Sequence, residues 1–131
     1  MSKPDSSSIR NSRLGWKVFV TPAVATVSDD LPPGETVRMW SPTSSVLIHG
    51  ERDAILVDTL TTTAQATALA DWVEKSGKNL TTIYITHGHG DHFFGNRTLL
   101  ERFPGARAVA RPKVLDDAKA SIAAGNGRTL E

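Results

Sequence analysis

Three histidines and an aspartate stand close together in one short segment of the chain. His87, His89, Asp91 and His92 fall within six residues, separated only by two glycines. Imidazole nitrogens and carboxylate oxygens are common ligands of divalent metal ions. A metal ion held in this way activates water for attack on a substrate. The segment therefore predicts a metal centre that supports hydrolysis.

The spacing of these four side chains favours two metal ions. His87 and His89 are two residues apart in a segment leaving a strand, so their imidazoles point to the same side. Asp91 and His92 are expected in the first turn of the next helix, where they cannot easily reach an ion held by the first two histidines. Two ions about 3.5 to 4 Å apart solve this problem. The chain has no cysteine, and this nitrogen-rich set favours zinc, although iron or manganese accepts the same groups.

A simpler interpretation needs no metal. Histidines before a helix can be surface residues, and an aspartate there is often an N-cap. The clustering argues against it, because three of the chain's four histidines lie together at the carboxyl end of a strand. Gly88 and Gly90 are expected to adopt unusual backbone angles that bring the main chain close to the metal.

The surrounding elements alternate between strands and helices. A capping box from Thr62 to Gln65 starts one helix, and the continuously apolar run Ile55-Leu56-Val57 predicts a strand buried on both faces. The order indicates parallel β-α-β crossovers preceded by an antiparallel hairpin. The expected strands are 44–49, 54–58, 80–86 and 106–110, after an apolar β-type run over 16–27, and the expected helices are 62–77, 93–103 and 112–124.

The motif resembles a known family signature. The hexapeptide from His87 to His92, followed by Gly95, is similar to the HxHxDH signature of the metallo-β-lactamase superfamily. Leu56-Val57-Asp58-Thr59 resembles the family's buried strand that ends in an aspartate, and the order of elements from about Ser44 to Ala124 also agrees. The family's usual glycine after that threonine is Leu60 here.

This resemblance implies roles for the motif residues. His87 and His89 would serve a first Zn²⁺ ion and Asp91 and His92 a second, with a bridging hydroxide as nucleophile. Asp91 is the candidate catalytic residue, because it would orient that hydroxide or pass on its proton. Asp58 either fixes the loop by hydrogen bonding or is an ordinary turn aspartate at the end of its strand.

The resemblance also implies the fold class, α/β, as one half of a four-layer αββα sandwich in which helices flank a mixed sheet. The expected division is a flexible tail over 1–15 and a metallo-β-lactamase-like domain over 16–131, incomplete at its C-terminus. The family's third-motif histidine, bridging aspartate and further histidine are not found downstream, and His49 is expected to be a solvent-facing strand residue. One face of the sheet would lack a cover, which leaves self-association through that face open as an alternative.

Composition limits the partners. Fifteen basic and fourteen acidic residues give a net charge of +1, so neither nucleic acid nor an anionic membrane is expected as a partner. The absence of cysteine and of a long apolar run favours a cytoplasmic protein that acts on a small molecule.

Two functional hypotheses follow. The first is a metal-dependent hydrolase acting on an ester, thioester, lactone or related substrate, with a glyoxalase-like thioesterase, a lactonase and a mononuclear iron dioxygenase all left open. The second is a truncated, non-catalytic remnant or a partner-dependent module that retains partial metal binding. Sharing of metals between two copies is a further alternative.

Overall fold

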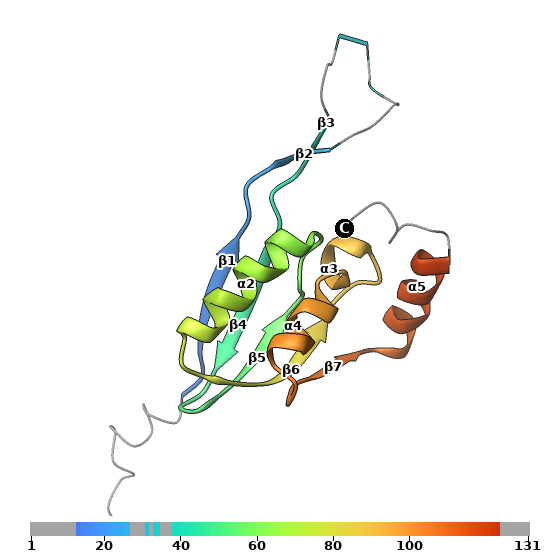
Figure 1. Cartoon of the computed structure of the whole chain (residues 1–131). Coiled ribbons are helices and arrows are strands. Elements are labelled where there is room, and N and C mark those ends of the chain that lie inside the picture. The colour runs from blue at the N-terminus through green and yellow to red at the C-terminus, as the bar shows by residue number, and fades with distance from the viewer. Residues whose placement is uncertain (1–12, 27–30, 32, 35–37, 124–131) are drawn as a thin grey trace, which may run out of the picture.

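The main element of the fold is a mixed five-stranded sheet with helices on one face (Figure 1). The computed structural model describes residues 13–26, 31, 33–34 and 38–123. The strand order in the sheet is β1-β4-β5-β6-β7, and β2 and β3 form a separate two-stranded sheet. The strands are β1 (Gly15–Val20), β2 (Val24–Thr26), β3 (Arg38–Trp40), β4 (Ser44–His49), β5 (Asp53–Val57), β6 (Asn79–Ile85) and β7 (Arg107–Ala110). The helices are α2 (Thr63–Lys75), α3 (Gly90–Phe93), α4 (Asn96–Arg102) and α5 (Pro112–Ala123).

Strand pairing follows the direction that the sequence predicts. β4 and β5 form the expected antiparallel hairpin, closed by a hydrogen bond of 2.9 Å from the Gly50 amide to the Asp53 carbonyl. β5, β6 and β7 run parallel, so their carboxyl ends meet at one edge of the sheet. β1 begins at Gly15 and adds an antiparallel strand beside β4. The predicted tail over 1–15 lies mostly outside the described residues.

Helix α2 begins at the predicted capping box. The Thr62 hydroxyl accepts a hydrogen bond of 3.1 Å from the Gln65 amide, and the Gln65 side chain accepts one of 3.2 Å from the Thr62 amide. One stripe of the helix is buried on the sheet and consists of Ala66, Leu69, Ala70 and Val73. This spacing of three and four residues is the period of an amphipathic helix. The α2 prediction is therefore confirmed.

An ion-pair cluster joins α2 to α4. Arg102 Nη1 donates hydrogen bonds to Asp71 Oδ1 at 2.8 Å and to Glu74 Oε2 at 3.0 Å. The hydrogen bond with Asp71 is the largest cause that raises the pKa of Arg102 above its ordinary value, and the negative charges of both carboxylates add to it. The guanidinium thus stays charged and links the two helices that cover the sheet.

The core lies between this helical layer and one face of the sheet. Leu47, Leu56 and Ile83 come from three neighbouring strands, and each is 0% exposed. On the opposite face of β5, Ile55 is 39% exposed. The prediction that Ile55-Leu56-Val57 is buried on both faces is wrong for the described residues. Figure 1 shows α2 and α4 on one face of the sheet, and Leu56 belongs to the core that includes residues of these helices. Continuous apolar sequence does not by itself show that both faces are covered.

The predicted single helix over 93–103 is two helices. α3 ends at Phe93 and α4 begins at Asn96. Between them, Gly95 lies so close to the loop after β5 that a Cβ atom would overlap the Thr59 carbonyl oxygen. The Gly95 amide donates a hydrogen bond of 3.2 Å to the Leu60 carbonyl, outside its own helix. This tertiary contact interrupts the helical pattern.

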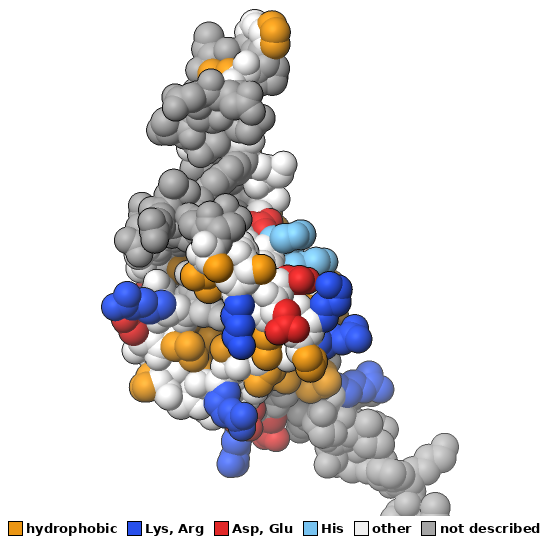
Figure 2. Space-filling model, turned by 90° about the vertical axis from the view of Figure 1, so that its right-hand side faces the viewer, with side chains coloured by type: hydrophobic (Ala, Val, Ile, Leu, Met, Phe, Trp, Pro, Cys, Tyr) orange, Lys and Arg blue, Asp and Glu red, His pale blue; other side chains and the backbone are white. Residues whose placement is uncertain are grey.

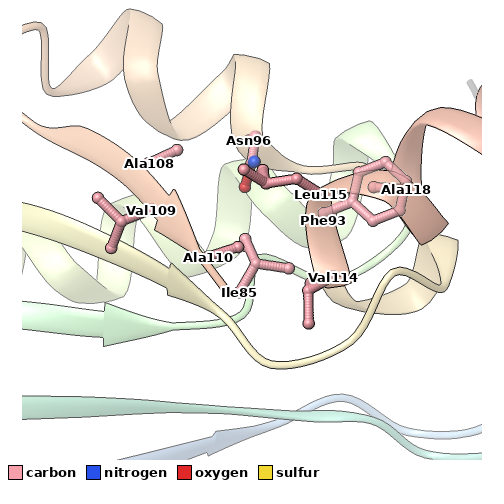
Figure 3. Close-up of a pocket in the computed structure, with 9 residues that line it drawn as sticks. All are labelled: Ile85, Phe93, Asn96, Ala108, Val109, Ala110, Val114, Leu115 and Ala118. Atoms are coloured by element: carbon pink, nitrogen blue, oxygen red, sulfur yellow. The ribbon is translucent and has the colours of Figure 1, made fainter. Parts of the chain in front are cut away.

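Helix α5 packs beside the sheet without burying any residue fully. A pocket of about 80 Å³ lies among β6, β7, α3, α4 and α5, and Figure 3 shows the residues that line it, most of them apolar. Asn96 is the polar side chain in its lining. The position of α5 matters for the site, because this helix also contacts the loop that follows β6.

Candidate functional site

The four predicted ligands lie together at the carboxyl end of β6. His87 and His89 are in the loop after this strand, and Asp91 and His92 are in α3. The ring centroids of His87 and His92 are 4.6 Å apart, and those of His87 and His89 are 6.1 Å apart with nearly parallel planes. Figure 2 shows histidine side chains gathered at one place on the surface, with acidic side chains beside them. The fold therefore brings together the residues that the sequence grouped.

The site is open to solvent. His87, His89 and Asp91 are exposed, whereas the His92 side chain is 28% exposed. Asp91 Oδ1 lies 3.6 Å from His92 Nε2. Accessible imidazole and carboxylate donors suit a site that must admit both metal and substrate. The chemistry of this donor set fits zinc.

The donors do not converge on one point. Within the part of the chain that the structure describes, no group of three or more His, Cys, Asp or Glu side chains is placed to hold one ion. The assignment of His87, His89, Asp91 and His92 to two ions therefore stays a prediction.

Asp58 anchors the site from the neighbouring strand. It follows β5, is 6% exposed and has a φ of 65°. Its Oδ1 accepts a hydrogen bond of 2.8 Å from the Thr86 amide. Its Oδ2 lies 2.6 Å from the Thr86 hydroxyl and 2.7 Å from His92 Nδ1. Of the two roles considered from the sequence, the hydrogen-bonded one agrees with this geometry.

The loop after Asp58 is hydrogen-bonded to both α3 and α4. The Thr59 amide donates a hydrogen bond of 2.9 Å to the His92 carbonyl, and the Thr59 hydroxyl donates one of 2.8 Å to Asn96 Oδ1. Leu60, at the position of the family's usual glycine, has a φ of 69° and is 0% exposed. The sequence assigns no role to Thr59, Thr86 or Asn96, and the Leu60 departure is a sequence signal that this loop has special geometry.

The two glycines of the motif are needed for space and not for unusual backbone angles. Among the described residues, positive φ at glycine occurs at Gly34 and Gly77 only, so the prediction for Gly88 and Gly90 is wrong. A Cβ at Gly88 would overlap the Asp117 side chain and lie 2.7 Å from the Ala118 amide nitrogen in α5. A Cβ at Gly90 would overlap the Phe94 ring.

The fourth histidine lies away from this site. His49 is the last residue of β4, at the end of the sheet opposite to the carboxyl end of β6, and its ring lies so close to Gly15 that a Cβ there would be 2.7 Å from His49 Cε1. His49 is the last residue of its strand, as expected, and it is half-buried, more covered than the solvent-facing position expected from the sequence. The close pairing of β1 with β4 explains this burial.

Comparison with known proteins agrees with the motif. The family model of the metallo-beta-lactamase superfamily matches residues 38–116. A hydroxyacylglutathione hydrolase from Synechocystis sp. is 49% identical over 41 residues, which are 31% of this chain and 16% of that protein. An (R)-specific secondary-alkylsulfatase from Pseudomonas sp. is 30% identical over 103 residues, which are 77% of this chain and 15% of that protein.

A solved structure shows the same fold. The metallo-beta-lactamase from Hirschia baltica superposes with a TM-score of 0.54 and 20% identity, and the match covers 86% of this chain and 44% of that one. The chain thus spans less than half the length of each of these proteins, which agrees with the prediction of one half of the αββα fold. Because the family model covers more than half of the residues and includes the whole motif, the chain belongs to the metallo-β-lactamase superfamily.

Proposed function

We propose that this chain carries the metal-binding half of a zinc-dependent hydrolase that cleaves a thioester or a related ester of a small molecule. One observation carries the proposal: three imidazoles and a carboxylate gather at the carboxyl end of β6, in a family of hydrolases. The match to a hydroxyacylglutathione hydrolase supports the thioester class. The match to an alkylsulfatase makes a sulfate ester the next substrate class to test.

Each residue of the set has a proposed role. His87 and His89 would hold one zinc ion, and Asp91 and His92 a second, with iron or manganese as substitutes. The ions, when bound, supply activation of water and polarisation of the substrate oxygen. Asp91 is proposed to accept or return the proton of the attacking water. Asp58 holds His92 in place through Oδ2.

A second candidate function is a module that binds metal only partly and needs a partner for catalysis. It is favoured by the finding that no three of the described donor side chains are placed to hold one ion. We place either function in the cytoplasm, a proposal supported by the lack of cysteine. No helix among the described residues is long and apolar enough to cross a membrane.

The experiment that tests the first proposal measures zinc and turnover in the same samples. Purified chain should bind zinc by competition with a chromophoric chelator and hydrolyse a hydroxyacyl thioester of glutathione, with a secondary alkyl sulfate as comparison. His87→Ala should reduce zinc affinity by at least ~10-fold, because a coordinate bond is lost. His49→Ala is the matched control, since His49 lies at the opposite end of the sheet from the carboxyl end of β6.

The outcomes separate the two candidates. Zinc binding that depends on His87 together with thioester turnover supports the hydrolase. Zinc binding without turnover of either substrate supports the partial module. Equal loss of zinc in the His49 and His87 variants contradicts the proposed ligand set.

A further inference from the structure

The hydroxyl of Thr86 lies between a buried carboxylate and two imidazoles. Its Oγ1 is 2.6 Å from Asp58 Oδ2, 2.9 Å from His87 Nδ1 and 3.3 Å from His92 Nδ1. The Thr86 amide also donates to the other Asp58 oxygen at 2.8 Å. Thr86 is half-buried at the end of β6, directly before the first histidine of the motif. Its position makes it the link between Asp58 and His87.

The number of protons decides the direction of each hydrogen bond. A threonine hydroxyl has one proton and two lone pairs, and a carboxylate oxygen only accepts. The Thr86 proton therefore goes to Asp58 Oδ2, which is its shortest contact. The lone pairs of Oγ1 are then left to accept. The contact of 2.9 Å with His87 is a hydrogen bond only if Nδ1 of His87 carries the proton.

The tautomer of His92 is set by a direct hydrogen bond to Asp58. Its Nδ1 lies 2.7 Å from Asp58 Oδ2, so Nδ1 donates to the carboxylate. The ring nitrogen that is not protonated in a neutral imidazole is set by the hydrogen bond that the other nitrogen makes. In both rings, the lone pair is consequently on Nε2, the atom that remains for a metal ion.

We propose that Thr86 is a positioning residue that sets the tautomer and orientation of His87 by relaying the hydrogen bond of Asp58. One buried carboxylate thereby orients two imidazoles, His92 directly and His87 through a hydroxyl. The inference rests on the proposed function in one respect, that Nε2 of these rings is where zinc would bind. The relay itself is a property of the metal-free chain.

Removal of the hydroxyl alone tests the relay. Thr86→Val keeps the branched shape and the amide that donates to Asp58 Oδ1, and it replaces the Oγ1 hydroxyl with a methyl group. Thr86→Ser restores a hydroxyl. Thr81→Val is a matched control, because Thr81 is a half-buried threonine of β6, the strand that leads to Thr86, and its hydroxyl donates to the Ala54 carbonyl at 3.4 Å.

The first readout is the protonated nitrogen of each ring. Two-bond ¹H–¹⁵N correlation spectra of metal-free protein at about pH 8.5, above the ordinary histidine pKa of about 6.5, distinguish Nδ1–H from Nε2–H. We expect Nδ1–H for His87 and His92 in the wild type. In Thr86→Val, His87 should become a mixture of tautomers while His92 keeps Nδ1–H. Thr86→Ser and Thr81→Val should leave both rings as in the wild type.

The second readout is zinc affinity. Loss of a group that orients a metal-binding histidine typically costs about 10- to 100-fold in metal affinity. Thr86→Val should therefore bind zinc at least ~10-fold more weakly, whereas Thr86→Ser and Thr81→Val should stay within about twofold of the wild type. Unchanged thermal unfolding of the variants, followed by circular dichroism, shows that the comparison concerns folded protein.

The results that overturn the relay differ from those that overturn the hydrolase. Nε2–H at His87 in the wild type, or an unchanged His87 tautomer in Thr86→Val, contradicts the role of Thr86 whatever the enzyme does. Equal zinc affinity of the wild type and Thr86→Val also contradicts it. The expected tautomers and affinities without turnover of any ester would leave the relay supported and would favour the partial module over the hydrolase.

Discussion

At the scale of single residues, two residues in the loop after β5 have a backbone conformation that L-residues rarely adopt. Asp58 has a φ of 65° and Leu60 a φ of 69°. Such a conformation costs roughly 1 to 2 kcal/mol at a non-glycine residue. At Asp58, three hydrogen-bond contacts with Thr86 and His92 offset the cost. At Leu60, complete burial of the side chain offsets it.

At Leu60, the glycine variant should therefore be more stable than the alanine variant, the reverse of the usual order within a helix. Both Leu60→Ala and Leu60→Gly lose a buried side chain, which costs roughly 2 to 5 kcal/mol. Leu60→Gly should nevertheless be about 1 kcal/mol more stable than Leu60→Ala, because glycine removes the strain that alanine retains. Denaturant unfolding followed by circular dichroism measures the difference. Leu69, inside α2, is the control position, where the alanine variant should be more stable than the glycine variant. If alanine is also the more stable variant at Leu60, the argument for strain at Leu60 is contradicted.

At the scale of elements, the structure assigns different roles to neighbouring residues of β5. Leu56 is 0% exposed and Ile55 is 39% exposed. Leu56→Ala should lower the free energy of unfolding by about 2 to 5 kcal/mol. Ile55→Ala should lower it by less, roughly 1 to 2 kcal/mol, since 39% of Ile55 stays in contact with water in the folded chain. Unfolding is measured at low protein concentration, and similar losses for the two variants would contradict a one-sided core.

Local patterns predicted most of the elements. The capping box and the stripe from Ala66 to Val73 define α2 because cap and period are both properties of nearby residues. The break between α3 and α4 escaped prediction, since it depends on the contact of Gly95 with Thr59, which is distant in the sequence. Burial of β5 was also misjudged, because a sequence of three apolar residues does not reveal which face has a covering layer.

The residues of the candidate site can be predicted from the sequence, but the hydrogen bonds between them cannot. His87, His89, Asp91 and His92 could be grouped from spacing alone, because they lie in one strand-to-helix segment. The Thr86 contacts with Asp58 join residues 28 apart, and no local pattern encodes them. Family resemblance drew attention to Asp58, and only the paired strands β5 and β6 show what it contacts.

At the scale of the whole molecule, one face of the sheet is apolar and exposed in the described chain. We name it the open sheet face, and its most exposed apolar residues are Trp16, Val18, Val20, Ile55 and Tyr84. The register places them on one side, since paired residues of neighbouring strands share a face. An exposed apolar surface of this kind is typical of a protein interface.

The 131-residue chain should therefore self-associate through the open sheet face. Sedimentation equilibrium should show a mass above that of the monomer, and the double variant Val18→Lys, Ile55→Lys should shift it toward the monomer, because two buried charges oppose association. Ala64→Lys with Ala68→Lys places the same charge on exposed positions of α2 and should leave the mass unchanged. A monomeric wild type at high concentration, or equal effects of both pairs, would contradict this interface.

The distance in sequence between Asp58 and the motif also links metal binding to folding. A peptide of residues 84–96 would contain every predicted ligand and yet lack Asp58, which lies 34 residues before His92. Ring orientation thus exists only after β5 and β6 have paired. Zinc that binds the folded chain in preference to the unfolded one adds about 1.4 kcal/mol to stability for each tenfold excess over its dissociation constant. Bound zinc should accordingly slow proteolysis of the chain, because it lowers the population of unfolded molecules.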